Sequence, residues 1–425
     1  MMRGSFSILC CTLLLLSSIS VSSQDNLRTY ADKIGMNLGT CVFHNAYSTD
    51  QTYSKIVKQD FNTLVAENEM KPDALQANRG QFNFSRADEM VKFAKANNMK
   101  MRGHTLVWHS QAPGWLQNLK GQELMKAMKD HITGVLTHYK ADNKTVIEWD
   151  VVNEAFHNDG TRGDLRSSFW SNNFGGDFID SAFVFAHQAD PDVLLYYNDY
   201  NTANVNAKST AIYEKCKKML ANGIPIHGIG FQSHQTLEEY TPAFMASVKE
   251  NFDRFAKLGL KIAVTELDIR ITTPTDQSEL KKQADYYREF MEVALANPAC
   301  RTFMIWGFTD KHSWVPGTFR GTDDALIYDK NFQPKPAYTS LLETLKAYKP
   351  SGIISTGKNQ RISSANMLNM SQNSTQTLFD LRGAKIGTYA VVSGNSSVSG
   401  LPHSMAGKTI ITQSGKQSVM IQNQR

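Results

Sequence analysis

Two glutamates could do chemistry together, because each ends a short apolar run and they lie far apart in the chain. Glu154 follows paired valines in WDVVNEAF, and Glu266 follows the apolar start of IAVTELDIR. A carboxylate normally stays in water, so these positions indicate strand ends that carry acids into a cleft. Paired carboxylates in a cleft carry out glycoside hydrolysis. The alternative is that each is a satisfied acid inside the fold.

The surroundings of the two glutamates predict different roles. Glu154 follows Asn153, whose amide could bind a sugar hydroxyl, and its apolar context favours the protonated form of a general acid. Glu266 lies two residues before Asp268, and His234 could be the cationic partner that keeps Glu266 ionised. We therefore assign Glu154 as the acid and Glu266 as the nucleophile.

The elements that must position these residues alternate between strand-like and helix-like segments from residue 34 to 348. The predicted strands are Ile34–Leu38, Thr63–Ala66, Met101–Val107, Val146–Val152, Val193–Asn198, Gly228–Gln232, Ile262–Glu266 and Phe303–Trp306. Helical spacing is clearest in Ser85–Asn97, Gly121–Tyr139, Asn206–Asn222, Ala243–Leu258 and Ser278–Ala296. This pattern predicts an α/β fold, a (β/α)8 TIM barrel, over a doubly wound sheet, because no glycine-rich phosphate loop follows the first strand.

Barrel enzymes carry their chemistry at the carboxyl ends of the strands, and the unusual residues of this chain gather there. They are Glu67, Asn68, Lys71, His104, Trp108, Asn153, Gln232, His234 and Trp306. Sugars present apolar faces and hydroxyl edges, so aromatic rings and amides suit them. Trp108, Trp306 and Trp314 fit the faces. The tyrosines at 196, 197 and 200 are further candidates, for which core packing is at least as good an explanation.

Other hydrolytic chemistries find less support. His104, His109 and His234 form neither an HxH pair nor an HExxH helix, so we expect no catalytic metal. A serine hydrolase is disfavoured because the GxSxG motif is absent.

Taken together, eight motifs resemble the family 10 glycoside hydrolases, the endo-β-1,4-xylanases, in order and spacing over about residues 28 to 348. They are GTCVFHNAY, LVAENEMKPDAL, RGHTLVWHSQAPGWL, WDVVNEAF, LLYYNDYN, HGIGFQSH, VTELDIR and WGFTDKHSW. The resemblance implies a (β/α)8 barrel, no cofactor, and a retaining double displacement with Glu154 as acid/base and Glu266 as nucleophile. It also implies that Asp268 orients His234. The sugar sites on the non-reducing side would be lined by Glu67, Asn68, Lys71, His104, Trp108, Asn153, Gln232, His234, Trp306 and Trp314.

The chain departs from the family pattern in a few places. The residues Val65-Ala66 before Glu67, and Pro72 after Lys71, differ from the common choices and concern support of the site more than its chemistry. Cys300, which pairs in some relatives, has no obvious partner nearby, so we expect no disulfide.

The N-terminus predicts a signal peptide over residues 1–23 and a secreted protein. Arg3 precedes an apolar stretch from residue 8 to 16, and small residues precede Gln24. The stretch is too short to span a membrane, and no later segment is long enough. Secretion agrees with five possible N-glycosylation sequences, at Asn83, Asn143, Asn369, Asn373 and Asn395.

The net charge of +5 comes from the C-terminal part of the chain. Residues 350–425 hold seven lysines and arginines and one acid, Asp380, whereas residues 24–349 hold 37 basic and 39 acidic residues. Nucleic acid is therefore not an expected partner. We expect a catalytic domain over 24–349, a Ser/Asn-rich linker over 350–376, and a basic extension or small β module over 377–425. Such a tail could attach weakly to acidic wall polymers or a cell surface.

The sequence thus favours a monomeric endo-1,4-β-xylanase that acts on xylan and xylo-oligosaccharides. Two alternatives stay open. A mixed-specificity β-1,4-glucanase would need room beside Trp306 and Trp314 for the hydroxymethyl group of glucose. A carbohydrate-binding barrel without activity is disfavoured, because both Glu154 and Glu266 are present.

Overall fold

The computed structural model describes residues 25–349 and four short strands beyond them, at 374–379, 385–391, 409–412 and 418–420. The chain divides into two compact units between residues 350 and 351. The predicted signal peptide and most of the predicted linker lie outside the described residues. No helix among the described residues is long and apolar enough to cross a membrane.

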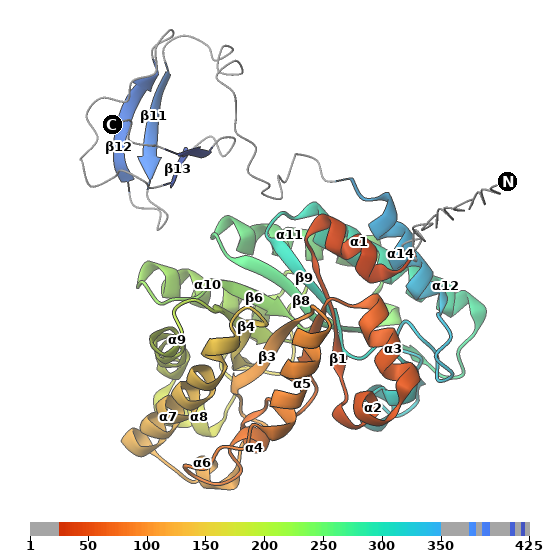
Figure 1. Cartoon of the computed structure of the whole chain (residues 1–425), viewed down its shortest axis with the longest axis horizontal. Coiled ribbons are helices and arrows are strands. Elements are labelled where there is room, and N and C mark those ends of the chain that lie inside the picture. The colour runs from red at the N-terminus through yellow and green to blue at the C-terminus, as the bar shows by residue number, and fades with distance from the viewer. Residues whose placement is uncertain (1–24, 350–373, 380–384, 392–408, 413–417, 421–425) are drawn as a thin grey trace, which may run out of the picture. The chain divides into compact units, whose positions relative to one another are not determined.

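Eight parallel strands of the first unit close into a barrel (Figure 1). They are β1 (Asn37–Val42), β2 (Thr63–Ala66), β3 (Lys100–Val107), β4 (Val146–Asn153), β5 (Leu194–Asp199), β6 (Gly228–Phe231), β8 (Lys261–Thr272) and β9 (Cys300–Ile305). Each strand pairs with the next in this order, and β9 returns to β1, with Phe303 opposite Leu38. Two short strands, β7 (His234–Thr236) and β10 (Thr322–Asp323), extend β8. The predicted (β/α)8 barrel is confirmed.

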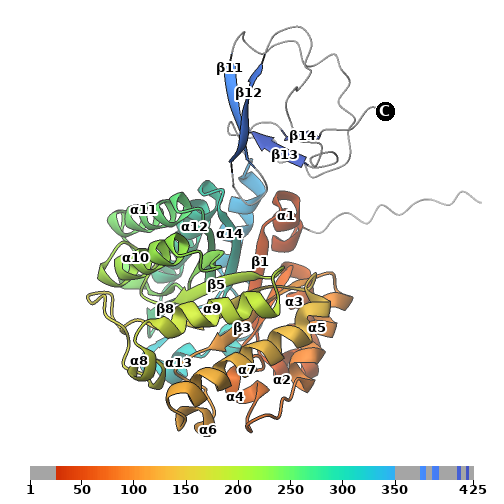
Figure 2. The same ribbon diagram turned by 90° about the vertical axis from the view of Figure 1, so that its left-hand side faces the viewer.

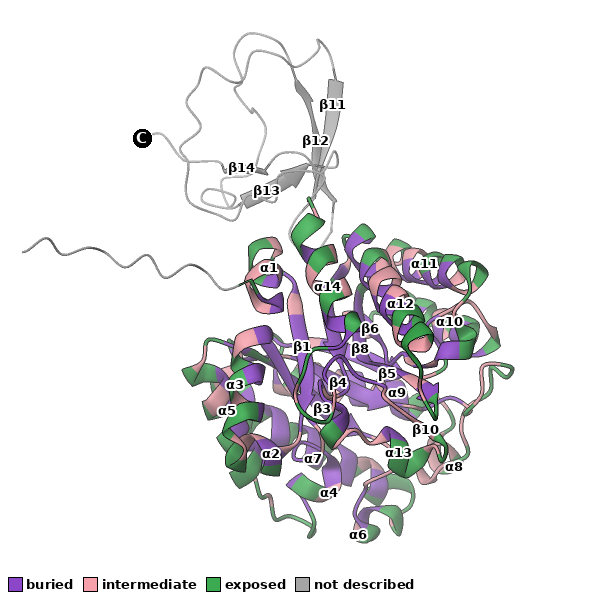
Figure 3. Ribbon diagram, turned by 90° about the vertical axis from the view of Figure 1, so that its right-hand side faces the viewer, coloured by how far each residue is buried: buried purple, intermediate pink, exposed green. Residues whose placement is uncertain are grey.

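Helices surround the barrel, so its strands are buried on both faces (Figures 2 and 3). They are α1 (Leu27–Ile34), α2 (His44–Thr49), α3 (Gln51–Asp60), α4 (Pro72–Leu75), α5 (Ser85–Ala96), α6 (Gly114–Gln117), α7 (Gly121–Tyr139), α8 (Phe169–Phe174), α9 (Asp177–Ala189), α10 (Ala207–Ala221), α11 (Pro242–Lys257), α12 (Gln277–Ala296), α13 (Val315–Thr318) and α14 (Pro336–Ala347). Short 3-10 turns lie at Lys140–Asp142, Leu237–Glu239 and Asp310–His312. The five helices predicted from spacing each agree within one residue at either end.

The first predicted strand, Ile34–Leu38, is wrong at its start. Helix α1 continues through Ile34, and β1 begins only at Asn37. Gly35 ends the helix in the left-handed conformation, with φ of 67°, and its N–H donates to the carbonyl of Ala31. A glycine that caps a helix in this way looks, in sequence, like part of the apolar run that follows it.

The seventh predicted strand, Ile262–Glu266, is too short. Strand β8 runs on to Thr272, because its second half pairs with β7 and β10 instead of with β6. Pairing with β6 ends at Val264. Glu266 therefore lies inside a strand, just beyond the barrel register, and not at the strand's last residue.

The interior of the barrel is partly polar. The Arg102 guanidinium lies 2.8 Å from Glu148 Oε1 and 3.0 Å from Asp150 Oδ2, and all three side chains are buried. On the opposite face of β4 Trp149 packs over Gly103, where a side chain would collide with the indole ring. The three cysteines of the described residues, Cys41, Cys216 and Cys300, are buried and free.

The described residues of the second unit form a four-stranded antiparallel sheet in the order β12, β11, β13, β14. The strands are β11 (Ser374–Phe379), β12 (Lys385–Val391), β13 (Thr409–Thr412) and β14 (Ser418–Met420). Thr377 pairs with Thr388 near the middle of the β11–β12 ladder. Strand β11 begins at Ser374 and so includes the last three residues of the linker expected over 350–376.

Candidate active site

Glu154 and Glu266 belong to one chain of side-chain hydrogen bonds that runs across the carboxyl ends of β4, β5 and β6 to the middle of β8. Asn198 Nδ2 donates to Glu266 Oε1 at 2.8 Å and to Asn153 Oδ1 at 3.0 Å. Gln232 Nε2 donates to the same Asn153 oxygen at 3.1 Å and to Glu154 Oε1 at 3.0 Å. The two carboxyl groups expected from the sequence are thus brought into one site, because neighbouring parallel strands end at one rim.

Glu154 has an unusual backbone. It follows the last residue of β4 with φ of 56°, a conformation that costs a residue other than glycine about 1–3 kcal/mol and that persists only where the surroundings fix it. Its N–H donates to the carbonyl of Asn198 at 2.9 Å, and its own carbonyl accepts from Arg166 Nε at 2.9 Å. Trp108 Nε1 donates to its Oε2 at 2.9 Å. Glu154 is therefore held both at its backbone and at its carboxyl group.

The environment of Glu154 favours its neutral form. Burial raises the pKa of this carboxyl above its ordinary value, and the negative charges of Asp199 and Glu266 add to the effect. Hydrogen bonds from Gln232 and Trp108 act in the opposite direction but do not outweigh it. A raised pKa favours the protonated carboxyl group, which is the form that a general acid requires.

The environment of Glu266 favours its ionised form. His234 Nε2 lies 3.1 Å from Glu266 Oε2, and His234 Nδ1 lies 2.8 Å from Asp268 Oδ2. Carboxylates only accept, so both ring nitrogens donate and the imidazole is a cation. Burial would lower the pKa of His234, but Asp268 and Glu266 raise it to about 10. Burial likewise raises the pKa of Glu266, but the His234 hydrogen bond and the charges of His104 and His234 bring it below its ordinary value.

The predicted hydroxyl-binding residues form a second cluster on the loop after β2. Lys71 Nζ donates to Asn68 Oδ1 at 3.1 Å and to Gln111 Oε1 at 2.7 Å, while Gln111 Nε2 donates to Asn68 Oδ1 at 3.1 Å. Lys71 Nζ also lies 5.1 Å from the ring centre of Trp108, which bonds Glu154. Burial lowers the pKa of Lys71 and raises that of Glu67. These donors and acceptors are linked through Trp108 to the carboxyl group of Glu154.

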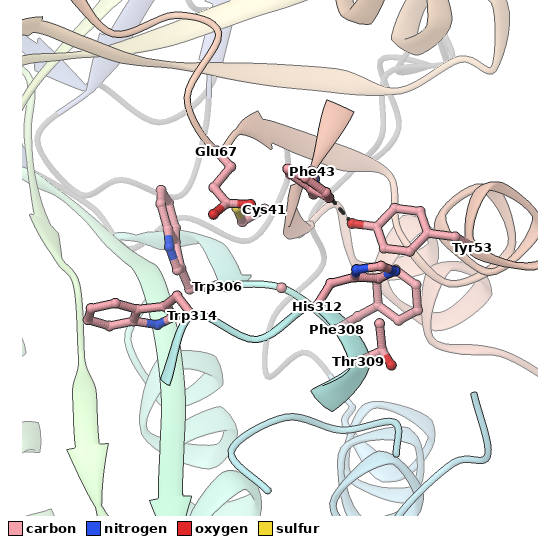
Figure 4. Close-up of a pocket in the computed structure, with 10 residues that line it drawn as sticks. Cys41, Phe43, Tyr53, Glu67, Trp306, Phe308, Thr309, His312 and Trp314 are labelled. Atoms are coloured by element: carbon pink, nitrogen blue, oxygen red, sulfur yellow. Dashed lines mark hydrogen bonds between the residues drawn. The ribbon is translucent and has the colours of Figure 1, made fainter. Parts of the chain in front are cut away.

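Aromatic rings border the other side of the site. Trp306 and Trp314 line one pocket with Glu67, as Figure 4 shows. Trp314 Nε1 donates to Asp268 Oδ2 at 2.8 Å, the oxygen that also accepts from His234. One buried carboxylate thus orients both a tryptophan and the histidine.

His104 is likewise fixed by a buried acid, because its Nδ1 lies 2.9 Å from Asp150 Oδ2. Its ring lies edge-on to Trp306 at 5.4 Å between ring centres. Asp150 and Glu148, paired with Arg102, are satisfied interior acids. Glu154 and Glu266 differ from them, because neither carboxyl is paired with an arginine or lysine among the described residues.

Some of the residues that the sequence offered as candidates for the site do not line it. Tyr196 is buried in the barrel, where the Arg102 guanidinium lies 4.5 Å from its ring centre, and Tyr197 is buried beside Asp199. Both are core residues. Burial and nearby positive charge lower the pKa of His109 to about 4, so this histidine is neutral near pH 7. Among the described residues no group of three or more His, Cys, Asp or Glu side chains could hold a metal.

Gln111 and Asn198 belong to the site but were missed in the sequence. Asn198 lies at the end of the fifth predicted strand, where the same criterion that selected Asn153 would have found it. Gln111 had no such signal, because it lies in a loop and only the fold brings it to Asn68 and Lys71.

Comparisons with known proteins found similar sequences. The sequence model of glycosyl hydrolase family 10 matches residues 26–344. Endo-1,4-beta-xylanase B of Thermotoga neapolitana is 42% identical over 341 residues, which is 79% of this chain and 96% of the relative. Exoglucanase XynX of Acetivibrio thermocellus is 36% identical over 322 residues, 73% of this chain and 29% of that larger protein.

Solved structures are similar to the barrel. Xylanase 10B from Thermotoga petrophila, in complex with xylobiose, has a TM-score of 0.72 and 40% identity, covering 76% of this chain and 97% of that one. An intracellular xylanase from Thermoanaerobacterium saccharolyticum, a glutamate-to-alanine mutant with xylotetraose, has a TM-score of 0.69 and 34% identity, covering 74% and 97%.

The His234–Glu266 contact predicts a pH effect. Activity at low pH requires that Glu266 is ionised. Replacing His234 by asparagine removes the neighbouring cation and therefore raises the pKa of Glu266. The acidic limb of the kcat/KM profile should then move to higher pH, by roughly 1–3 units. The control is His138→Asn, which breaks a more exposed His–Asp contact on α7 and should leave the limb in place. An acidic limb that stays put or moves to lower pH in folded His234→Asn protein would contradict the assignment.

Proposed function

Because the chain belongs to glycosyl hydrolase family 10, we propose that it is an endo-1,4-β-xylanase that cleaves internal β-1,4 bonds of xylan with retention of anomeric configuration. The observation that carries the proposal is the opposite electrostatic setting of two linked carboxyl groups. The pKa of Glu154 is raised and that of Glu266 is lowered, which matches an acid and a nucleophile.

In the first step a Glu266 oxygen forms a bond to the anomeric carbon while the bond from that carbon to the departing sugar oxygen breaks. Glu154 gives its proton to the departing oxygen, so the leaving chain departs as a neutral alcohol. The product is a glycosyl ester on Glu266. The Asn198 hydrogen bond and the His234 cation hold the Glu266 oxygens in place for this attack.

In the second step water attacks the anomeric carbon, and Glu154, now ionised, takes a proton from that water. The bond to Glu266 breaks, and the carboxylate returns to its contact with His234. Two inversions at one carbon give net retention. This course requires the two carboxyl groups to lie about 5–5.5 Å apart across the bound sugar.

Xylan is the preferred substrate because a related structure holds xylobiose and another holds xylotetraose. A second candidate is mixed β-1,4-glucanase activity, which is favoured by a relative named as an exoglucanase. Trp306 and Trp314 line the pocket that would have to admit the hydroxymethyl group of glucose. Hydrolysis rates on xylan and carboxymethylcellulose, measured side by side, distinguish the two.

Two substitutions test the roles of the glutamates. Glu266→Ala should abolish turnover of xylan and of aryl xylobiosides alike, because no nucleophile is left. Glu154→Ala should lose about 10²–10⁴-fold in kcat/KM on xylan but much less in kcat/KM on a dinitrophenyl xylobioside, whose leaving group needs no proton. Exposed Glu214 on α10 supplies the control, since Glu214→Ala should keep full activity. Wild-type rates on xylan in the Glu266→Ala protein would end the proposal.

We further propose that the protein is secreted and monomeric, with residues 1–23 removed. The support is the charged, apolar and small-residue order of that segment. Family membership does not decide location, since the Thermoanaerobacterium relative is described as intracellular. N-terminal sequencing of protein from the culture medium should begin near Gln24, and size-exclusion chromatography should give the mass of one chain. Full-length protein found only inside cells would contradict secretion.

The basic tail is proposed to hold the enzyme weakly on acidic wall polymers. Its seven basic residues and single acid support attraction that salt would screen. Intact protein should bind insoluble wall material at low salt and elute at high salt, whereas protein that lacks residues 350–425 should stay in solution with unchanged xylanase activity. Equal retention of the two proteins would refute this role.

A further inference from the structure

A buried ion pair lies behind Glu154. Strand β5 ends at Asp199, and the first turn of α10 carries Lys208, whose Nζ lies 2.7 Å from Asp199 Oδ1. Both side chains have no exposed surface. The free energy lost when two charges are removed from water is often as large as the attraction between them. A buried ion pair therefore does not by itself indicate a gain in stability. Its position next to the proposed acid suggests another role.

One side of the pair reaches the peptide after Glu154 through a tyrosine. Tyr197 OH donates to Asp199 Oδ2 at 2.7 Å and accepts from the N–H of Ala155 at 3.0 Å. An ionised carboxylate can only accept, so it fixes the direction of the tyrosine proton and leaves an oxygen lone pair for Ala155. Tyr197 thereby links Asp199 to the backbone N–H that follows Glu154.

The other side reaches the carbonyl of Glu154 through a second tyrosine. The N–H of Tyr200 donates to Asp199 Oδ1 at 2.9 Å, and Lys208 Nζ lies 4.0 Å from the centre of the Tyr200 ring. Tyr200 OH accepts from Arg166 Nη2 at 2.8 Å, and Arg166 Nε donates to Glu154 O at 2.9 Å. The contacts form a closed ring that begins and ends at the Glu154–Ala155 segment.

We propose that the Asp199–Lys208 pair, acting through Tyr197 and Tyr200, is a positioning device that holds Glu154 in its left-handed backbone conformation and aims its carboxyl at the departing oxygen. A left-handed residue other than glycine persists only when its neighbours fix it, and the ring supplies hydrogen bonds on both sides of Glu154. The proposal rests on the proposed function, in which Glu154 is the acid.

The chain offers a matched comparison away from the site. Asp60, at the end of α3, accepts from Tyr328 OH at 2.7 Å and from Tyr338 OH at 2.9 Å, and all three residues are buried. This cluster makes the same tyrosine–carboxylate bonds but contacts neither glutamate of the site. Removing one hydroxyl from each cluster therefore separates positioning from ordinary structural support.

The experiment compares Tyr197→Phe with Tyr338→Phe on xylan and on a dinitrophenyl xylobioside, together with the melting temperature of each protein. Misplacement of the acid lowers kcat/KM, which reports the first step, only where the leaving group needs a proton. We therefore expect Tyr197→Phe to lower kcat/KM on xylan by roughly ten- to a hundredfold, with a much smaller loss on the activated substrate. Tyr338→Phe should leave the ratio of the two activities at its wild-type value.

A second variant tests the charges without leaving one unpaired. Asp199→Asn combined with Lys208→Met removes both members of the pair and should shift the ratio of activities in the same direction as Tyr197→Phe. An unchanged ratio in Tyr197→Phe, with a loss of melting temperature like that of Tyr338→Phe, would overturn the proposal.

Glu154→Ala in the same assays separates this proposal from the proposed function. If Glu154→Ala loses both activities equally, the acid role itself fails. If it retains the activated substrate while Tyr197→Phe keeps the wild-type ratio, only the positioning role fails.

Discussion

The site depends on keeping two nearby carboxyl groups in opposite protonation states. Repulsion between like charges in a buried site makes double ionisation costly, and the protein resolves this by giving only Glu266 a cation. His234 serves as that cation because Asp268 holds its other ring nitrogen. Glu154 has no cation within ion-pairing distance among the described residues, receives only neutral N–H donors on its carboxyl, and has its pKa raised. The different side chains that contact each carboxyl group thus account for the difference between the acid and the nucleophile.

The barrel supplies the second requirement, which is position. Strands β4, β5, β6 and β8 are neighbours in the sheet. The ends of the first three and the middle of β8 present Asn153, Asn198, Gln232 and Glu266 at one rim. The amides link these strand ends, so a shift of one strand would disturb the others. Inside the barrel Arg102 pairs with the buried acids Glu148 and Asp150. It does not pair with Glu154 or Glu266.

Much of this arrangement could be predicted from local sequence, and the failures have physical causes. The eight strands and five helices follow from spacing, and Glu154 and Glu266 follow from acids placed after apolar runs. The start of β1 was wrong because Gly35 ends a helix within an apolar stretch. The length of β8 was wrong because its extension depends on β7 and β10, which are distant partners. Gln111 and the Lys208–Asp199 pair were missed for the same reason, since only tertiary contacts give these residues their roles.

In the proposed reaction Glu266 attacks the anomeric carbon, while Glu154 donates a proton in the first step and accepts one in the second. This assignment is tested most directly by incubating the protein with a 2-fluoro-xylobioside that has a good leaving group, and then mapping its peptides by mass spectrometry. The fluorine slows the second step, so a stable 2-fluoro-xylobiosyl ester is expected to accumulate on Glu266. An adduct on Glu154, or release of a product of inverted configuration with no adduct, would contradict it.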